Sequence, residues 1–86
     1  MNSSMSVVDR VAGLFVKCFK LEPDEFSRDL VPEDVLLWDS LGHMNLVMEL
    51  EDEFGLHLEV DEITEMSSAG KIIDILKAKG VKDDGA

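Results

Sequence analysis

The sequence predicts an all-α fold: a small bundle of three main helices plus one short helix, with a long loop after the first helix. Apolar residues recur at helical spacing in three segments, each preceded by a serine or an Asp-Ser pair of the kind that caps helices. Only one short segment alternates as a strand would. The chain has 86 residues, 45% of them hydrophobic, and can bury one modest core. We therefore expect a single domain over residues 1–86, with an ordered core at about 5–80 and a loose tail at 81–86.

The first helix is expected to begin after Ser6, which with Asp9 resembles a capping box in which Asp replaces Glu. It should end near Phe19 or Lys20. Its core-facing stripe is Val7, Val11, Leu14, Phe15 and Cys18. Cys18 is predicted to pack in the core, because nothing near it in the sequence would lower its pKa. A single cysteine excludes an internal disulfide and is consistent with a reducing compartment.

A long connection, residues 21–39, separates the first two helices. A short helical turn is possible around Pro23–Phe26 or Pro32–Val35, since proline suits the first position of a helix. A loop of this length in a compact domain needs side chains of its own to hold it in place. The apolar residues expected to do so are Phe26, Leu30, Val35, Leu36, Leu37 and Trp38. For Trp38 we expect packing at the mouth of the next helix.

The second helix is expected to start at Asp39-Ser40-Leu41 and to run through Phe54, with apolar residues on two faces. The core-facing stripe is His43, Leu46, Val47, Leu50 and Phe54. A second row, nearly opposite, is Leu41, Met44 and Met48, with Glu51 and Asp52 along its edges. Exposed apolar residues beside acids are typical of a docking surface, and methionine suits one that fits several partners.

Beyond this helix, Gly55 is a predicted helix stop. Leu56–Val60 alternates apolar and polar residues, but it has no partner strand, so we expect an extended loop. Asp61 can cap a short helix through Met66, with Ile63 and Met66 pointing inward.

The last helix is expected to be capped by Ser67 or Ser68 and to end at Gly80. Its buried stripe is Ile72, Ile73 and Leu76, and the basic residues that suit its C-terminal end are Lys77 and Lys79.

The charge distribution restricts the class of partner. The net charge is -11, and no Lys or Arg lies between Asp29 and Gly70. Such a surface repels nucleic acid and anionic membranes, and it attracts proteins that carry a basic patch. The N-terminal residues do not show a basic segment followed by an apolar core, and no apolar run approaches the length of a membrane span, so we expect neither secretion nor membrane insertion. We expect a cytoplasmic monomer that neither binds nucleic acid nor inserts into membranes.

Ser40 is the candidate site. At a helix start, free N–H groups and the helix dipole favour a phosphate, so a phosphodiester on this hydroxyl would be well placed. Asp39-Ser40-Leu41, joined to the aliphatic and acidic run Leu46–Phe54, resembles the second helix of an acyl carrier protein, whose serine carries a 4'-phosphopantetheine arm. The resemblance extends with correct spacing over almost all of the chain.

The resemblance implies a carrier that is not itself an enzyme. A phosphopantetheinyl transferase would attach the arm from coenzyme A to Ser40, with Asp39 and Leu41 beside it. Acyl intermediates would then be held as thioesters for lipid, polyketide or related biosynthesis. The implied partner-binding residues are Leu41, Met44, Met48, Glu51 and Asp52, and the acyl-pocket candidates are His43, Leu46, Val47, Leu50 and Ile63. Further implied partners are acyl- or aminoacyl-loading enzymes, condensing enzymes and acyltransferases with basic patches.

Two positions depart from the sequence pattern of the acyl carrier proteins that serve fatty acid synthesis. Gly42-His43 follows the triplet where an acid is usual, and Asn45 stands where a glutamate is usual. We therefore expect a specialised carrier. Two alternative functions stay open at this point: an aminoacyl or D-alanyl carrier, and a helical adaptor with unmodified Ser40.

Other sites are disfavoured by the sequence. The acids of residues 49–65 lack the spacing of a calcium loop. His43 and His57 lack a companion set of metal ligands. Asp39, Ser40 and His43 are neighbours at one helix start and cannot form a catalytic triad with its oxyanion hole.

Overall fold

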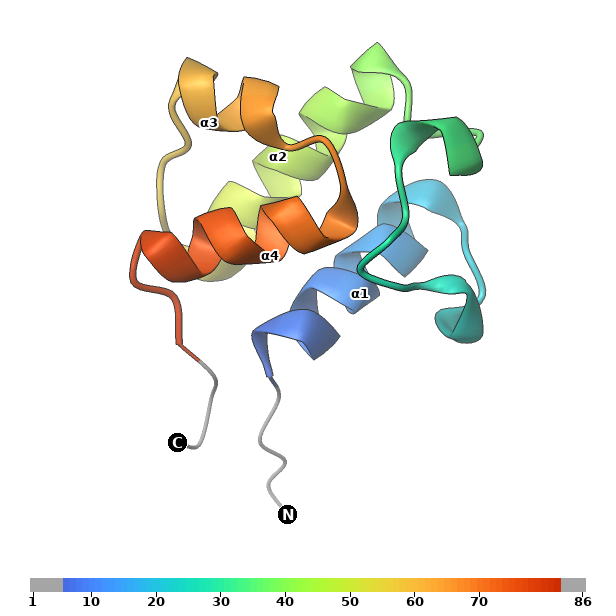
Figure 1. Ribbon diagram of the computed structural model, residues 1–86, viewed down its shortest axis with the longest axis horizontal. Helices are drawn as coiled ribbons and strands as arrows, with labels where there is room; N and C mark the ends of the chain where they lie inside the picture. The colour runs from blue at the N-terminus through green and yellow to red at the C-terminus, as the bar shows by residue number, and fades with distance from the viewer. Residues whose placement is uncertain (1–5, 83–86) are drawn as a thin grey trace.

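The computed structural model describes residues 6–82, and it contains four α-helices and no strand within that range (Figure 1). The helices are α1 (Val7–Phe19), α2 (Ser40–Phe54), α3 (Val60–Glu65) and α4 (Ala69–Ala78). Each proline of the long connection begins a 3-10 turn, and these turns are η1 (Pro23–Glu25) and η2 (Pro32–Asp34). The predicted fold class is confirmed, with three main helices, one short helix and a long loop after the first.

Helix α1 has the predicted ends. The Ser6 hydroxyl oxygen accepts the Asp9 N–H at 3.0 Å, which satisfies one of the free donors of the first turn. Lys20 adopts a left-handed conformation, φ 58°, and ends the helix. Cys18 is half-buried and packs against the core.

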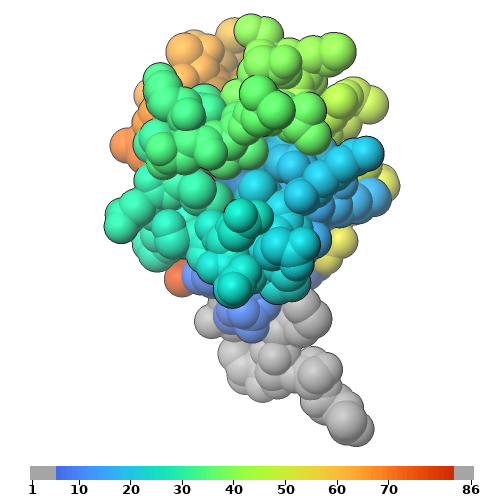
Figure 2. Space-filling model, turned by 90° about the vertical axis from the view of Figure 1, so that its right-hand side faces the viewer, coloured from blue at the N-terminus to red at the C-terminus, as the bar shows by residue number. Residues whose placement is uncertain are grey.

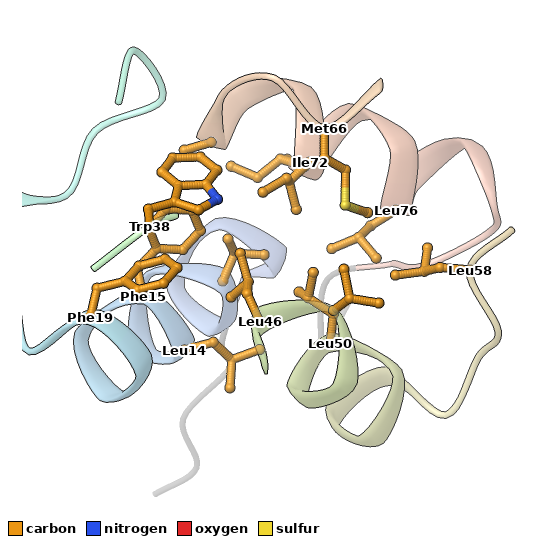
Figure 3. Packing of buried hydrophobic residues seen from close by; sticks show 14 of the residues in the cluster. Leu14, Phe15, Phe19, Trp38, Leu46, Leu50, Leu58, Met66, Ile72 and Leu76 are labelled. Carbon is orange, nitrogen blue, oxygen red and sulfur yellow. The ribbon is translucent and has the colours of Figure 1, made fainter. Parts of the chain in front are cut away.

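Residues from α1, α2 and α4 enclose one hydrophobic core (Figure 3). An aromatic cluster occupies one side of it. The Phe15 ring meets Phe19, Phe26 and Trp38 edge-on at centroid distances of 5.3, 5.1 and 4.9 Å. Aliphatic residues fill the rest, among them Leu46, Leu50, Leu58, Ile72 and Leu76.

The connection between α1 and α2 is held to the core by only some of its apolar residues. Val35 and Trp38 are buried, and Phe26 and Leu30 are half-buried. The prediction was wrong for Leu36 and Leu37, which are 93% and 41% exposed. The Trp38 N–H donates to the Val35 oxygen at 3.0 Å, so these four residues form a tight turn. The two ends of such a turn face the core while its two middle residues project into solvent.

Backbone hydrogen bonds also fix this connection against α4. The N–H groups of Ala69 and Gly70 donate to the carbonyl oxygens of Leu30 and Arg28 at 2.9 and 2.8 Å. The first turn of α4 therefore finds acceptors in the connection, and the connection covers one face of the molecule (Figure 2). These bonds explain how so long a loop keeps a fixed path.

The segment between α2 and α4 follows the prediction with one correction. Gly55 ends α2 with φ 62°, and an extended loop follows it. The cap of α3 is Glu59 and not Asp61: the side chain of Glu59 accepts the N–H of Glu62, while the Glu62 carboxylate accepts the Glu59 N–H at 2.8 Å. Because of this reciprocal pair, the helix begins at Val60, earlier in the chain than predicted. As predicted, Met66 points inward and is buried, and Ile63 packs partly against the core.

Glu62 also ties α3 to the end of α4. Its carboxylate oxygens lie 2.9 and 3.0 Å from the Lys79 Nζ. The Glu59 N–H and, to a smaller extent, Lys79 favour the charged form, so the pKa of Glu62 lies below its ordinary value.

Helix α4 is capped by Ser68, whose hydroxyl oxygen accepts the Lys71 N–H at 3.1 Å. The predicted stripe of Ile72, Ile73 and Leu76 is buried. Gly80 adopts φ 100° after the helix, and the Val81 N–H donates to the Leu76 oxygen at 3.1 Å. Val81 also packs partly on the core, so this first residue of the predicted loose tail is held in place.

Predictions for residues 1–5 and for the tail residues 83–86 lie outside the described residues. Within residues 6–82, none of the helices combines the length and apolar character needed to cross a membrane.

Candidate functional site

Ser40 is exposed and is the first residue of α2. The capping role belongs to its neighbour: the Asp39 carboxylate accepts the Gly42 N–H at 2.8 Å, and the Asp39 carbonyl accepts the His43 N–H at 2.7 Å. Because the Asp39 side chain caps the helix through the Gly42 N–H, the Ser40 hydroxyl is not needed as a cap. It stands free at the positive end of a 15-residue helix.

An open hollow lies beside Ser40. Its volume is about 560 Å³, which is within the size range of small-molecule sites. It is lined by residues from η2, the mouth of α2, and α3 with the residue that follows it: Pro32, Trp38, Asp39, Ser40, His43, Met44, Ile63, Thr64 and Met66. The candidate serine therefore borders a space with both polar and apolar walls.

Trp38 and His43 connect three parts of the chain at this hollow. The Trp38 Nε1–H donates to the His43 Nδ1 at 2.8 Å, and the His43 Nε2 lies 3.1 Å from the Ile63 carbonyl oxygen. The Nε2-protonated tautomer of His43 satisfies both contacts, accepting at one nitrogen and donating at the other. The two rings are also stacked, with an interplanar angle of 17°. We call this chain of contacts the Trp38–His43–Ile63 bridge.

The five acyl-pocket candidates fall into two groups. His43 and Ile63 are half-buried and line the hollow. Leu46, Val47 and Leu50 are at most 3% exposed and belong to the core. The structure therefore does not bring the five together around one space.

The second apolar row of α2 is exposed as the helical spacing predicts. Leu41, Met44 and Met48 are 73%, 46% and 64% exposed. Asp52 is exposed on the same helix and makes no ion pair with any residue of the range 6–82. These four side chains are free to contact a partner.

Glu51, also a predicted partner-binding residue, has a structural contact. One of its carboxylate oxygens accepts the Leu58 N–H at 2.8 Å and lies 3.4 Å from the Nδ1 of the exposed His57. Its side chain therefore supports the loop after α2, a role that the sequence pattern did not predict.

Other acids of α2 hold α1. Glu49 lies 3.0 Å from the Lys17 Nζ, and Glu53 lies 2.9 Å from the Arg10 Nε. The hydrogen bond that the Lys17 ammonium donates to the Glu49 carboxylate is the main cause that raises the pKa of Lys17. The Arg10 guanidinium also lies over the Phe54 ring, 4.5 Å from its centroid. Two of the acids of α2 are therefore paired with basic residues of α1 and help to hold the two helices together.

Sequence reasoning missed several residues near the site. Thr64, Pro32 and Met66 line the hollow, although the sequence marked Pro32 only as the start of a turn and Met66 only as a core residue, and did not mark Thr64. The exposure of Leu36 could have been predicted from the sequence, because four successive apolar residues from Val35 to Trp38 in a loop cannot all face one core.

His43 and Cys18, considered above for other chemistries, have structural contacts. Both ring nitrogens of His43 are engaged in the bridge, so neither is free to take a proton from Ser40. Burial raises the pKa of the Cys18 thiol, which suits packing better than reaction. Among residues 6–82, no group of three or more His, Cys, Asp or Glu side chains is placed to hold a metal ion.

The described residues form a small all-α domain with an exposed serine at the start of α2. No protein-family model matches the chain. It is 26% identical to the acyl carrier protein of Lactobacillus johnsonii (strain CNCM I-12250 / La1 / NCC 533) over 72 residues, which are 84% of this chain and 90% of that protein. With the helical fold, this similarity supports the resemblance to acyl carrier proteins. It points to a carrier and not to an enzyme.

Proposed function

We propose that Ser40 carries a 4'-phosphopantetheine arm and that the protein presents acyl groups to enzymes of lipid, polyketide or related biosynthesis. The observation that supports this most directly is the exposed Ser40 hydroxyl at the start of α2, beside an open hollow and relieved of capping by Asp39. The resemblance of this helix to that of acyl carrier proteins supplies the identity of the group.

The attachment is a phosphoryl-group transfer onto this oxygen. The Ser40 oxygen forms a bond to the β-phosphorus of coenzyme A and loses its proton to a base of the transferase. The bond to the leaving 3',5'-adenosine bisphosphate breaks. Asp39 caps the first turn through the Gly42 N–H, and the N-terminus of α2 would favour the phosphodiester anion by about 0.3–1 kcal/mol. When bound, the arm supplies a thiol that carries the acyl group as a thioester.

The exposed row on α2 is the proposed partner surface. Leu41, Met44 and Met48 provide apolar contact, and Asp52 with the exposed edge of Glu51 provides negative charge. A net charge of -11 steers partners with basic patches toward the protein. These partners are the phosphopantetheinyl transferase, loading enzymes, condensing enzymes and acyltransferases, and we place the protein in the cytoplasm as a monomer.

We further propose a specialised carrier, and Gly42 gives this hypothesis a structural reason. A Cβ at position 42 would clash with the Leu37 carbonyl oxygen and lie 3.2 Å from the Phe19 ring. The acid that is usual after the triplet in fatty acid synthesis therefore does not fit here. Rapid elongation at the rate of a housekeeping carrier, measured as turnover with general fatty acid enzymes, would count against this hypothesis.

Intact-protein mass spectrometry tests the attachment. Incubation with coenzyme A and a broad-specificity transferase should add the mass of one arm to the wild type and to Ser67→Ala, a control at another exposed serine. Ser40→Ala should show no gain. No gain in the wild type, or a gain that survives Ser40→Ala, would reject the carrier function and favour an adaptor. The activating enzyme that then loads the thiol distinguishes an acyl from an aminoacyl or D-alanyl carrier.

A further inference from the structure

We propose that the Trp38–His43–Ile63 bridge closes the core of this carrier to its cargo, so that acyl groups stay in the hollow beside Ser40 and short or polar groups are favoured over long alkyl chains. This inference rests on the proposed function, because it concerns the cargo of a Ser40-linked arm.

A wall separates the hollow from the core. Trp38 and Met66 line the hollow, yet both are only 2% exposed and belong to the core cluster. Behind them, Leu46, Leu50 and Ile72 have no exposed surface. An alkyl chain on an arm attached to Ser40, lying in the hollow, would therefore meet this wall before it reached the aliphatic core.

The indole of Trp38 is fixed on several sides. Its ring stacks on Phe19 at a centroid distance of 5.7 Å and meets Phe15 edge-on at 4.9 Å. Its N–H is held by His43, which is held in turn by the Ile63 carbonyl of α3. The bridge thus joins the connection, α2 and α3 at the edge of the hollow.

Passage of a chain would break this arrangement. Separation of α2 from α3 parts His43 from Ile63, and movement of the indole leaves its N–H without an acceptor in a part-buried place. A polar group that loses its partner away from water is costly. Since no buried side-chain polar atom within residues 6–82 lacks a partner, opening would create a defect that the closed state does not have.

The hollow itself suits a different cargo. Its lining residues include the polar Asp39 and Thr64 and the apolar Met44 and Ile63. Because it is open, a long alkyl chain lying in it would keep much of its surface in water. A short acyl group, or one with hydroxyl or amide groups, loses little by staying there.

The test loads Ser40 from acetyl-, butanoyl- and octanoyl-coenzyme A with the broad-specificity transferase, and measures the midpoint of thermal unfolding, Tm, for each product. In the wild type we expect Tm to stay constant along the series. In His43→Ala, which removes the bridge, octanoyl loading should raise Tm above that of the acetyl form by more than about 4 °C, because the chain can then be buried. Trp38→Phe keeps an aromatic ring but removes the N–H together with part of the indole, and it should show a smaller rise.

A second measurement needs no variant. Methyl NMR signals of Leu46 and Leu50 in the wild type should not shift between the acetyl and octanoyl forms. A rise of the wild-type Tm with chain length, or shifts of those methyl signals, would overturn the closed core while leaving the carrier function intact. A constant Tm in both variants would show that the bridge is not what excludes the chain. Failure of every donor to add mass at Ser40 would instead refute the proposed function, and this inference with it.

Discussion

The two faces of α2 carry similar apolar residues in opposite surroundings. Leu46, Val47 and Leu50 are at most 3% exposed and contribute to the core. Leu41 and Met48 on the other face are more than 60% exposed. One helix therefore shows which apolar residues the fold requires and which it does not.

This difference separates stability from recognition. Burial explains the inner stripe, because each side chain there is removed from water and closely packed. No folding contact explains the outer row, which makes partner binding the simplest reason for its apolar character. Substitutions on the two faces should affect different measurements.

The largest effect on stability is expected on the inner face. Leu50→Ala should lower the free energy of unfolding by about 2–5 kcal/mol, since it removes buried methyl groups and leaves a cavity. Met48→Ala, the control on the outer face, should change it by less than about 0.5 kcal/mol. Urea unfolding measures both, and equal losses would contradict the assignment of the two faces.

Gly42 tests how closely the connection packs on the mouth of α2. Gly42→Ala should cost about 1–3 kcal/mol, because the added methyl group clashes with the Leu37 carbonyl oxygen. Gly13→Ala is the matched control: a Cβ there meets nothing within 4 Å, and alanine should stabilise α1 by about 0.5–1 kcal/mol. A stabilising Gly42→Ala would show that the connection does not hold this close contact.

Leu41→Ala tests the outer face as a binding surface. We expect kcat/KM of the transferase reaction to fall by about tenfold, the loss that corresponds to one apolar interface contact, while thermal stability stays unchanged. Val60→Ala replaces a residue of similar exposure, 76%, on α3 and should leave kcat/KM unaltered. An equal fall of kcat/KM in both variants would show that the outer face of α2 is not a specific binding surface.

The smallest effect concerns pH. The pKa of Glu62 is lowered in the folded state, so its charged form adds stability above its ordinary value of 4.5, and this contribution is lost as the pH falls through the lower folded value. Glu62→Gln should therefore be less stable than the wild type at pH 7, and the gap should close below pH 4.5. Urea unfolding at several pH values measures this gap, and a gap independent of pH would exclude the carboxylate contacts as its cause.

The helices could be predicted because their signals are local. Ser6, Ser68 and Gly55 mark helix ends through contacts within a few residues, and the apolar spacing fixes the buried faces. The cap of α3 was misplaced because Glu59 is an unusual capping residue that works here through its pairing with Glu62.

The site could be predicted only in part. The helix-start pattern placed Ser40, and the second apolar row placed Leu41 and Met48 on the surface. The hollow depends on α3 lying against the mouth of α2, and the contact of His43 with Ile63 joins residues 20 positions apart. No local spacing encodes such a contact, so the bridge emerged only from the structure.

Trp38 is the only tryptophan of the chain, and its indole lies in the wall beside Ser40. Its fluorescence depends on the polarity around the ring and on the imidazole against which it stacks. Any group that fills or rearranges the adjoining space should change the wavelength and intensity of that emission. The protein therefore contains a built-in optical reporter, with which attachment and turnover can be followed continuously without a dye or an isotope.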